Sequence, residues 1–134
     1  MKITRFVKDL RENEIFVFGS NELGIHGAGA AKTAKQWGAR YGQGIGLMGR
    51  TYGIPTVEKL NPYTTLSLMT IKQHVDDFIQ FANKNKNKIF LVTKIGCGLA
   101  GFKDYQIAPF FKNCMNMKNI HLPGSFVVII KSMN

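Results

Sequence analysis

The chain contains little cysteine, few acidic residues and no long hydrophobic run. Cys97 and Cys114 are the only cysteines among 134 residues, too few to form a disulfide framework. Because Cys97 has no second cysteine in a CxxC spacing, the sequence does not support a zinc site, and we expect no metal or other cofactor. No apolar run is long enough to span a bilayer, and residues 1–13 lack the apolar segment of a signal peptide. We therefore expect a cytoplasmic protein without membrane contact.

Basic residues strongly outnumber acidic ones. Lys and Arg total 18 against 8 Asp and Glu, giving a formal net charge of +10 and a pI of about 9.8. Such an excess favours anionic partners, including nucleic acids, nucleotides and acidic surfaces. Only Lys84, Lys86 and Lys88 form a dense group. These lysines suit the C-terminal end of a helix and a solvent-exposed loop. The alternative is that they bind the phosphate backbone of a nucleic acid. The cationic residues of 1–13 are expected to face solvent.

The length suits one domain, residues 1–134, with a hydrophobic core. We predict strands at 15–18, 52–55, 89–92, 120–122 and 126–130, and helices at 28–37, 68–83 and 104–111. A short strand and a turn are expected within 1–13. The alternation predicts an α/β fold: a three-layer α/β/α sandwich around a mostly parallel or mixed central sheet.

Single residues add three local expectations. Pro55 is expected to end the strand at 52–55, so residues 56–66 are predicted to be a connecting loop. Asp104 is predicted to be the N-cap of the helix that follows it. His74 lies among the polar positions of its helix and is predicted to be solvated.

Small polar residues and glycines follow the predicted strand at 15–18. Ser20 and Asn21 stand where the strand would end, and glycines at positions 24, 27 and 29 let the backbone turn sharply or approach a ligand closely. A strand that leads into a helix through glycines directs free backbone N–H groups at one point, which suits a phosphate group. An ordinary turn is the alternative for this stretch alone.

Two further stretches are rich in glycine. Gly42–Gly53 contains too many glycines for a regular helix, and it is either a flexible surface loop or a loop that lies flat against a ligand. Gly96–Gly101 follows the apolar strand at 89–92. Ligands of α/β proteins bind beyond the carboxyl ends of strands. If the strands at 15–18 and 89–92 are neighbours, their glycine loops converge on one crevice suited to a diphosphate.

Two of these segments together resemble the macrodomain family of ADP-ribose-binding proteins. VFGSNELGIHGAGAA at Val17–Ala31 resembles the family's strand, glycine-rich loop and helix, and VTKIGCGLAGF at Val92–Phe102 resembles its other phosphate-binding loop. The IGCGL string is similar to the branch that removes ADP-ribose from glutamate side chains, and to related phosphatases acting on ADP-ribose 1″-phosphate. Together with Gly42–Thr56, the pattern also resembles a compact macro-like group of bacteria and their phages. The resemblance covers Ile15–Phe111.

The resemblance implies that ADP-ribose or a related nucleotide is the partner, either free or attached to a protein or nucleic acid. Asn21 matches the asparagine that contacts the distal ribose in this family. The remaining binding residues implied in this way are Ser20, Gly27, Ala28, Gly29, Gly96, Cys97, Gly98, Leu99, Ala100 and Gly101.

The catalytic residues of the glutamate-specific branch are not matched. Its lysine and aspartate fall at Val57 and Ala100 here, so hydrolysis of an ADP-ribosyl bond or terminal phosphate would need His26, Asp104 or Lys59 instead. His26 is equally compatible with a histidine that bonds to the loop backbone or touches phosphate. Cys97 is either a nucleophile beside glycine amides or a small residue chosen for tight packing. Binding without turnover explains the sequence equally well.

Two other classes of function compete with a macro-like binder. A basic nucleic-acid-binding protein would use the net charge together with Tyr41, Tyr52 and lysines, but most phenylalanines occupy core-like positions. A dinucleotide-dependent oxidoreductase is disfavoured because the loop after Phe18 is not GxGxxG. No acidic residue follows at the distance expected for that class.

Overall fold

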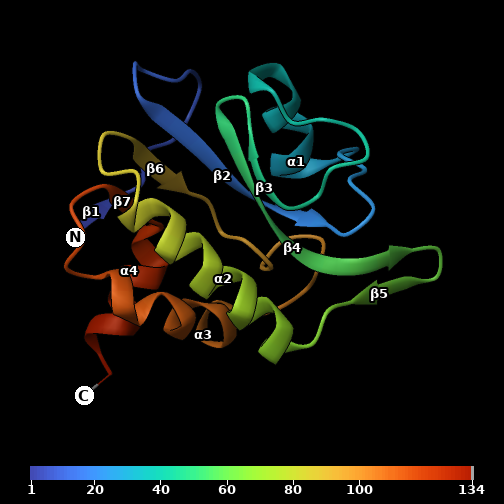
Figure 1. Ribbon diagram of the computed structural model, residues 1–134. Helices are drawn as coiled ribbons and strands as arrows, with labels where there is room; N and C mark the ends of the chain where they lie inside the picture. The colour runs from blue at the N-terminus through green and yellow to red at the C-terminus, as the bar shows by residue number, and fades with distance from the viewer. Residues whose placement is uncertain (134) are drawn as a thin grey trace.

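Seven strands form one mixed sheet in the computed structural model, which describes residues 1–133 (Figure 1). The strands are β1 (Lys2–Ile3), β2 (Glu14–Asn21), β3 (Gly46–Met48), β4 (Thr51–Leu60), β5 (Tyr63–Thr65), β6 (Ile89–Val92) and β7 (Ile120–Leu122). Their order is β1-β7-β6-β2-β4-β3, and β5 pairs with β4. Strands β1, β7, β6, β2 and β4 are parallel, whereas β3 and β5 run antiparallel to β4. The predicted α/β class and mixed sheet are confirmed.

Helices cover both faces of the sheet and complete the three layers (Figure 1). They are α1 (Gly29–Ala34), α2 (Leu68–Asn83), α3 (Asp104–Ile107) and α4 (Gly124–Lys131), with 3-10 turns at Lys35–Trp37 and Ala108–Cys114. Side chains alternate along β2, so each face of this strand has its own core. Phe16 and Phe18 pack with α1, whereas Ile15 and Val17 pack with the other helices.

The connections between parallel strands bring two loops to one edge of the sheet. The chain passes from β2 through α1 to its neighbour β4, and then returns through α2 to β6 on the other side of β2. β2 and β6 are therefore adjacent and parallel, with Glu14 paired to Ile89 and Val17 to Val92. Their carboxyl ends lead to α1 and α3, which lie on opposite faces. This is the switch point at which open α/β sheets bind ligands.

The two most regular predicted elements are confirmed. α2 spans residues 68–83, and Ile71, Val75, Phe78 and Ala82 are buried at the spacing of one helix face. Ser67 is its N-cap, because its Oγ accepts a hydrogen bond of 3.1 Å from the Thr70 N–H. β6 is a central strand whose last three residues are buried, as its continuous apolar run predicts.

The prediction that Pro55 ends a strand and that 56–66 is a loop is wrong. β4 continues through Pro55 to Leu60 and turns into β5, which forms a hairpin that extends away from the helices (Figure 1). On the side of β4 opposite β2, the pairing with β3 ends at Gly53 and the pairing with β5 begins at Val57. Pro55 lies in the gap between these partners, where a missing N–H breaks no ladder.

The predicted strand at 126–130 is also wrong, because these residues belong to α4. Phe126, Val127 and Ile130 are buried and Val128 is 68% exposed, a pattern that a helix produces and a strand does not. A short apolar run does not distinguish the two from sequence. Asp104 is the first residue of α3 rather than its N-cap, which is Lys103. His74 is only half-buried, but both of its ring nitrogens are inaccessible and unpaired within residues 1–133, so it is not solvated as predicted.

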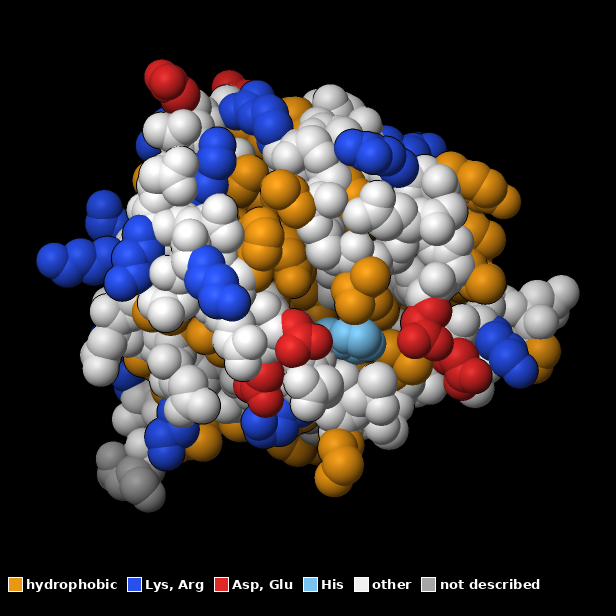
Figure 2. Space-filling view, in the orientation of Figure 1, with side chains coloured by type: hydrophobic (Ala, Val, Ile, Leu, Met, Phe, Trp, Pro, Cys, Tyr) orange, Lys and Arg blue, Asp and Glu red, His pale blue; other side chains and the backbone are white. Residues whose placement is uncertain are grey.

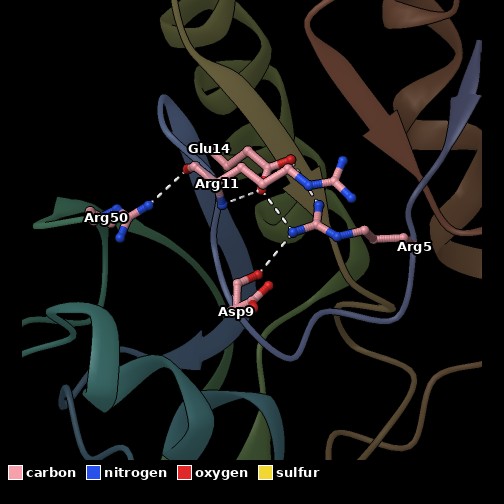
Figure 3. A network of polar contacts seen from close by, with 5 residues as sticks. All are labelled: Arg5, Asp9, Arg11, Glu14 and Arg50. Atoms are coloured by element: carbon pink, nitrogen blue, oxygen red, sulfur yellow. Dashed lines mark hydrogen bonds and ion pairs between the residues drawn. The ribbon is translucent and has the colours of Figure 1, made fainter.

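A buried carboxylate at the start of β2 ties the N-terminal segment to the sheet (Figure 3). Glu14 accepts two hydrogen bonds of 2.8 Å from Arg5 and one of 2.7 Å from the Arg11 N–H. Arg5 also donates to the Asp9 carbonyl, and Arg50, just before β4, donates to the Arg11 carbonyl. Arg5 is thus committed to an ion pair, which corrects the expectation that every cation of this segment faces solvent. Burial raises the pKa of Glu14, but the Arg5 and Arg11 contacts outweigh burial and lower it.

Candidate functional site

A cleft of about 630 Å³ lies beyond the carboxyl ends of β2 and β6. Gly19, Ser20 and Asn21 of β2 line it together with the loop that leads into α1 and the loop that follows β6. The β4–β5 hairpin adds a further wall through Leu60 and Tyr63. The predicted convergence of the two glycine loops on one crevice is confirmed, and the volume suits a small-molecule ligand.

Asn21 shapes the first loop. Its Oδ1 accepts a hydrogen bond of 3.0 Å from the Ile25 N–H, and its Nδ2 donates one of 2.7 Å to the Ile25 carbonyl. Within residues 1–133, the N–H groups of Gly27, Ala28 and Gly29 donate to no protein acceptor. Three consecutive N–H groups without a protein acceptor at the wall of a cleft have the chemistry that suits an anion.

The second loop has the same property. The Cys97 N–H donates to the Lys94 carbonyl at 3.2 Å and the Phe102 N–H to the Gly96 carbonyl at 2.9 Å, so the loop folds back on itself. The N–H groups of residues 98–100 find no acceptor in the described chain. Gly96 has a φ of 75°, and an added Cβ would lie 3.2 Å from the Ile107 side chain. Only glycine fits this position without strain.

The loop at Gly42–Gly53 packs against the protein rather than against the cleft. It contains β3, and none of its residues lines the cleft. The Ser20 hydroxyl donates to the Gly44 carbonyl, and a Cβ added at Gly44 would overlap the Asn21 carbonyl oxygen. Gly44 therefore allows two backbone segments to touch, and the alternative of a loop flat against a ligand is not supported.

We expect Gly44→Ala to lower the free energy of unfolding by about 3 kcal/mol, because the added methyl group forces the end of β2 away from its neighbour. Urea unfolding measures the change. Gly27→Ala is the matched control, since a Cβ at Gly27 meets no atom within 4 Å and should change stability by less than about 0.5 kcal/mol. Equal stability of the two variants would contradict the close approach at Gly44.

His26 faces the protein interior instead of the cleft. It is 4% exposed, and its Nε2 lies 2.8 Å from the Arg40 carbonyl oxygen and 2.9 Å from that of Gln43. Two carbonyl acceptors require Nε2 to carry a proton and donate it. The ring also packs edge-on against Phe18, with centroids 5.4 Å apart. His26 therefore matches the expectation of a loop histidine bonded to the backbone, and its ring does not reach a cleft ligand.

The other two predicted catalytic residues also lie outside the lining of the cleft. Lys59 is exposed on the hairpin, whereas Val57 and Leu60 line the cleft. Asp104 lies behind the second loop, where its Oδ2 is 3.3 Å from the Lys94 Nζ. The neighbouring Ser125 hydroxyl lowers the pKa of Asp104 despite partial burial, as do the Cys97 thiol and Lys94. A lowered pKa makes this carboxylate a weak general base and a poor general acid near pH 7.

Cys97 lines the cleft, but its thiol is not activated. Burial, together with the neighbouring Asp104 carboxylate, raises the pKa of Cys97 to about 12, so the thiol stays protonated near neutral pH. A protonated thiol packed against the main hydrophobic core is a packing group. The tight-packing interpretation of Cys97 is the better supported one.

Of the binding residues implied by the family resemblance, all except Gly101 line the cleft. Gly101 ends the second loop with a φ of 81°. Sequence reasoning missed Thr56, Leu60 and Tyr63, because they lie beyond Pro55 in the stretch expected to be a connecting loop. Val57, the position that the resemblance gives to the family's catalytic lysine, also lines the cleft. Sequence reasoning also missed Thr93, Lys94 and Ile95. Their place directly after β6, at the carboxyl end of a buried strand, was the available signal.

The cationic residues do not form one continuous band on the face seen in Figure 2. Lys and Arg side chains lie there in separate groups, with Asp and Glu side chains near the lower centre. Tyr52, one of the aromatics considered for nucleic-acid stacking, is buried against Phe78 with centroids 5.1 Å apart. Tyr41 is 85% exposed. These positions leave Tyr52 unable to stack on a base.

No protein-family model matches the chain, and neither a curated protein nor a solved structure is significantly similar to it. No helix in residues 1–133 combines the length and apolar character needed to cross a membrane. Within the same residues, no three His, Cys, Asp or Glu side chains are grouped so as to hold a metal ion.

Proposed function

We propose that this protein binds ADP-ribose or a related ADP-ribosyl nucleotide in the cleft between its two glycine loops. The observation that carries the proposal is the convergence of two sets of unpaired backbone N–H groups, at 27–29 and 98–100, beyond adjacent parallel strands. Backbone N–H groups bind phosphate oxygens without requiring a charged side chain. Two such sets that line one cleft suit two linked phosphates.

The form of the cleft supports a ligand larger than a diphosphate. About 630 Å³ is more than two phosphate groups occupy, and the hairpin supplies the apolar and aromatic side chains of Leu60 and Tyr63. Such a wall suits the less polar parts of a nucleotide. The choice of ADP-ribose among nucleotides rests on the macrodomain resemblance of Val17–Ala31 and Val92–Phe102.

The proposal is one of binding and does not extend to hydrolysis. None of His26, Lys59 and Asp104 lines the cleft, and no other described residue lining it carries a carboxylate or an imidazole. General acid–base catalysis needs such a group within hydrogen-bonding reach of the reacting atoms. A protein that holds and sequesters an ADP-ribosyl nucleotide fits these side chains.

Calorimetric titration with ADP-ribose, ADP and a short single-stranded RNA, at moderate and high salt, tests the proposal. We expect micromolar or tighter binding of ADP-ribose and weaker binding of ADP. Asn21→Ala should weaken ADP-ribose binding at least about tenfold, because the loop loses both hydrogen bonds to Ile25. Chromatography of the ADP-ribose recovered after the titration tests for hydrolysis, and we expect the recovered ADP-ribose to be intact.

A different result would favour the competing function. Absence of ADP-ribose binding, together with RNA binding that falls steeply as salt rises, would indicate a basic nucleic-acid-binding protein. The net charge of +10 would then outweigh the glycine loops as a guide to function.

A further inference from the structure

Lys94 is the only residue with a charged side chain among the described residues that line the cleft. It is the second residue after β6, at the sheet edge from which both glycine loops arise. Every other lining residue contributes backbone or an uncharged side chain. A cleft with one cation and no anion attracts negatively charged ligands and places their charge near that cation.

Lys94 forms an ion pair with Asp104. The Nζ of Lys94 lies 3.3 Å from the Asp104 Oδ2, longer than the roughly 2.8 Å of a strong charge-assisted hydrogen bond. The Lys94 side chain is 55% exposed and that of Asp104 is 28% exposed. Ion pairs this open to solvent are weak, and the flexible stem of lysine allows its ammonium group to change partner.

We propose that Lys94 binds the phosphate groups of the ligand and that Asp104 competes with the ligand for Lys94. This inference rests on the proposed function and names the charged contact of the same site. Asp104 is paired with Lys94 and stays ionised at neutral pH because its pKa is lowered. Its negative charge both restrains Lys94 and repels phosphate from that side of the cleft. Asp104 thus reduces affinity instead of contributing to it.

Two substitutions are expected to act in opposite directions. Lys94→Met should weaken ADP-ribose binding about tenfold or more, because a charged hydrogen bond is lost. Asp104→Asn should strengthen it about three- to fivefold, because the competing charge is removed while size and shape are kept. Lys103→Met is the matched control, since it removes a neighbouring exposed cation that does not line the cleft. It should change affinity by less than about twofold.

Calorimetric titration of the three variants with ADP-ribose, inorganic pyrophosphate and adenosine measures these effects. Adenosine has no phosphate, so its binding should be the same in wild type and Lys94→Met. The affinity of the wild type for ADP-ribose should fall with salt more steeply than that of Lys94→Met. This comparison keeps the test decisive even if circular dichroism melts show that Asp104→Asn is poorly folded.

The outcomes separate this inference from the proposed function. ADP-ribose binding that is unchanged in Lys94→Met, or weakened in well-folded Asp104→Asn, would overturn the role of the pair and leave the proposed function standing. Pyrophosphate binding that depends on Lys94, without ADP-ribose binding, would support the pair and overturn the proposed ligand. A wild-type protein that binds neither compound would overturn both.

Discussion

Gly98→Glu is expected to reduce the affinity for ADP-ribose at least about 100-fold while leaving the fold intact. Gly98 lines the cleft, and a Cβ at this position would meet no protein atom within 4 Å. Its φ is outside the left-handed region, so a side chain introduces no backbone strain. A glutamate there extends into the open cleft, where its carboxylate occupies the proposed phosphate site and repels the ligand.

Calorimetric titration and thermal unfolding followed by circular dichroism measure the two parts of this prediction. Gly98→Ala should give a smaller loss, because a methyl group only obstructs close approach of the phosphate. Gly124→Ala is the control outside the cleft: it lies in α4, and a Cβ there makes ordinary contacts of 3.6 Å and 3.7 Å with Ile3. Wild-type affinity in a folded Gly98→Glu protein would show that the ligand does not lie against the second loop.

Arg5→Ala is expected to lower the free energy of unfolding by about 3 to 5 kcal/mol at pH 7. The Glu14 carboxylate has a side-chain exposure of 5% and accepts both guanidinium hydrogen bonds of Arg5 (Figure 3). Removal of Arg5 leaves a negative charge buried with a single backbone donor, from Arg11. An uncompensated buried charge is among the most destabilising changes a point mutation can make. Urea unfolding measures the loss.

The pH dependence of this loss identifies its cause. The pKa of Glu14 is lowered in the folded protein, so its ion pair stabilises the wild type above the unfolded value near 4.5 and loses this contribution as pH falls through the folded value. In Arg5→Ala, burial dominates and Glu14 can take up a proton. The deficit of Arg5→Ala should therefore be smaller at pH 3 than at pH 7. In a Glu14→Gln background, the contribution of residue 14 to stability should not change between pH 3 and pH 7, because glutamine does not titrate. If Arg5→Ala lowers the free energy of unfolding equally at both pH values, the loss comes from packing of the Arg5 stem.

The sequence predicted the elements whose patterns have one explanation. The helical spacing of Ile71, Val75 and Phe78 over a long segment allows a single structure, and this helix was predicted correctly. The short apolar run of β6 is also correctly predicted as a strand, although such a run alone suits a strand or a buried helix. The convergence of the two loops followed from the rule that parallel strands end at one edge. The sequence did not show that β2 and β6 are neighbours, because strand order depends on contacts between residues that are distant in the chain.

The errors have equally specific causes. The hairpin was missed because Pro55 fits within β4 only where neither β3 nor β5 pairs with it. The extents of β3 and β5 cannot be inferred from the residues around Pro55. The run 126–130 is short enough to suit a strand or a buried helix. The direction of the His26 ring depends on carbonyl groups 14 and 17 residues further along the chain, which no local pattern reveals. Backbone loops were therefore more predictable here than the side chains beside them.

The eight residues of β2 carry two unrelated tasks at their two ends. Glu14 anchors the N-terminal segment at the first residue, and Asn21 shapes the first glycine loop at the last, roughly 23 Å away at about 3.3 Å per residue. Substitutions so far apart and without shared partners add independently in free energy. Substitutions that alter the proposed ligand preference of the cleft are therefore not expected to change the contribution of Glu14 to the stability of the fold. Stabilising changes at the Glu14 end are equally free to accumulate without altering what the cleft accepts.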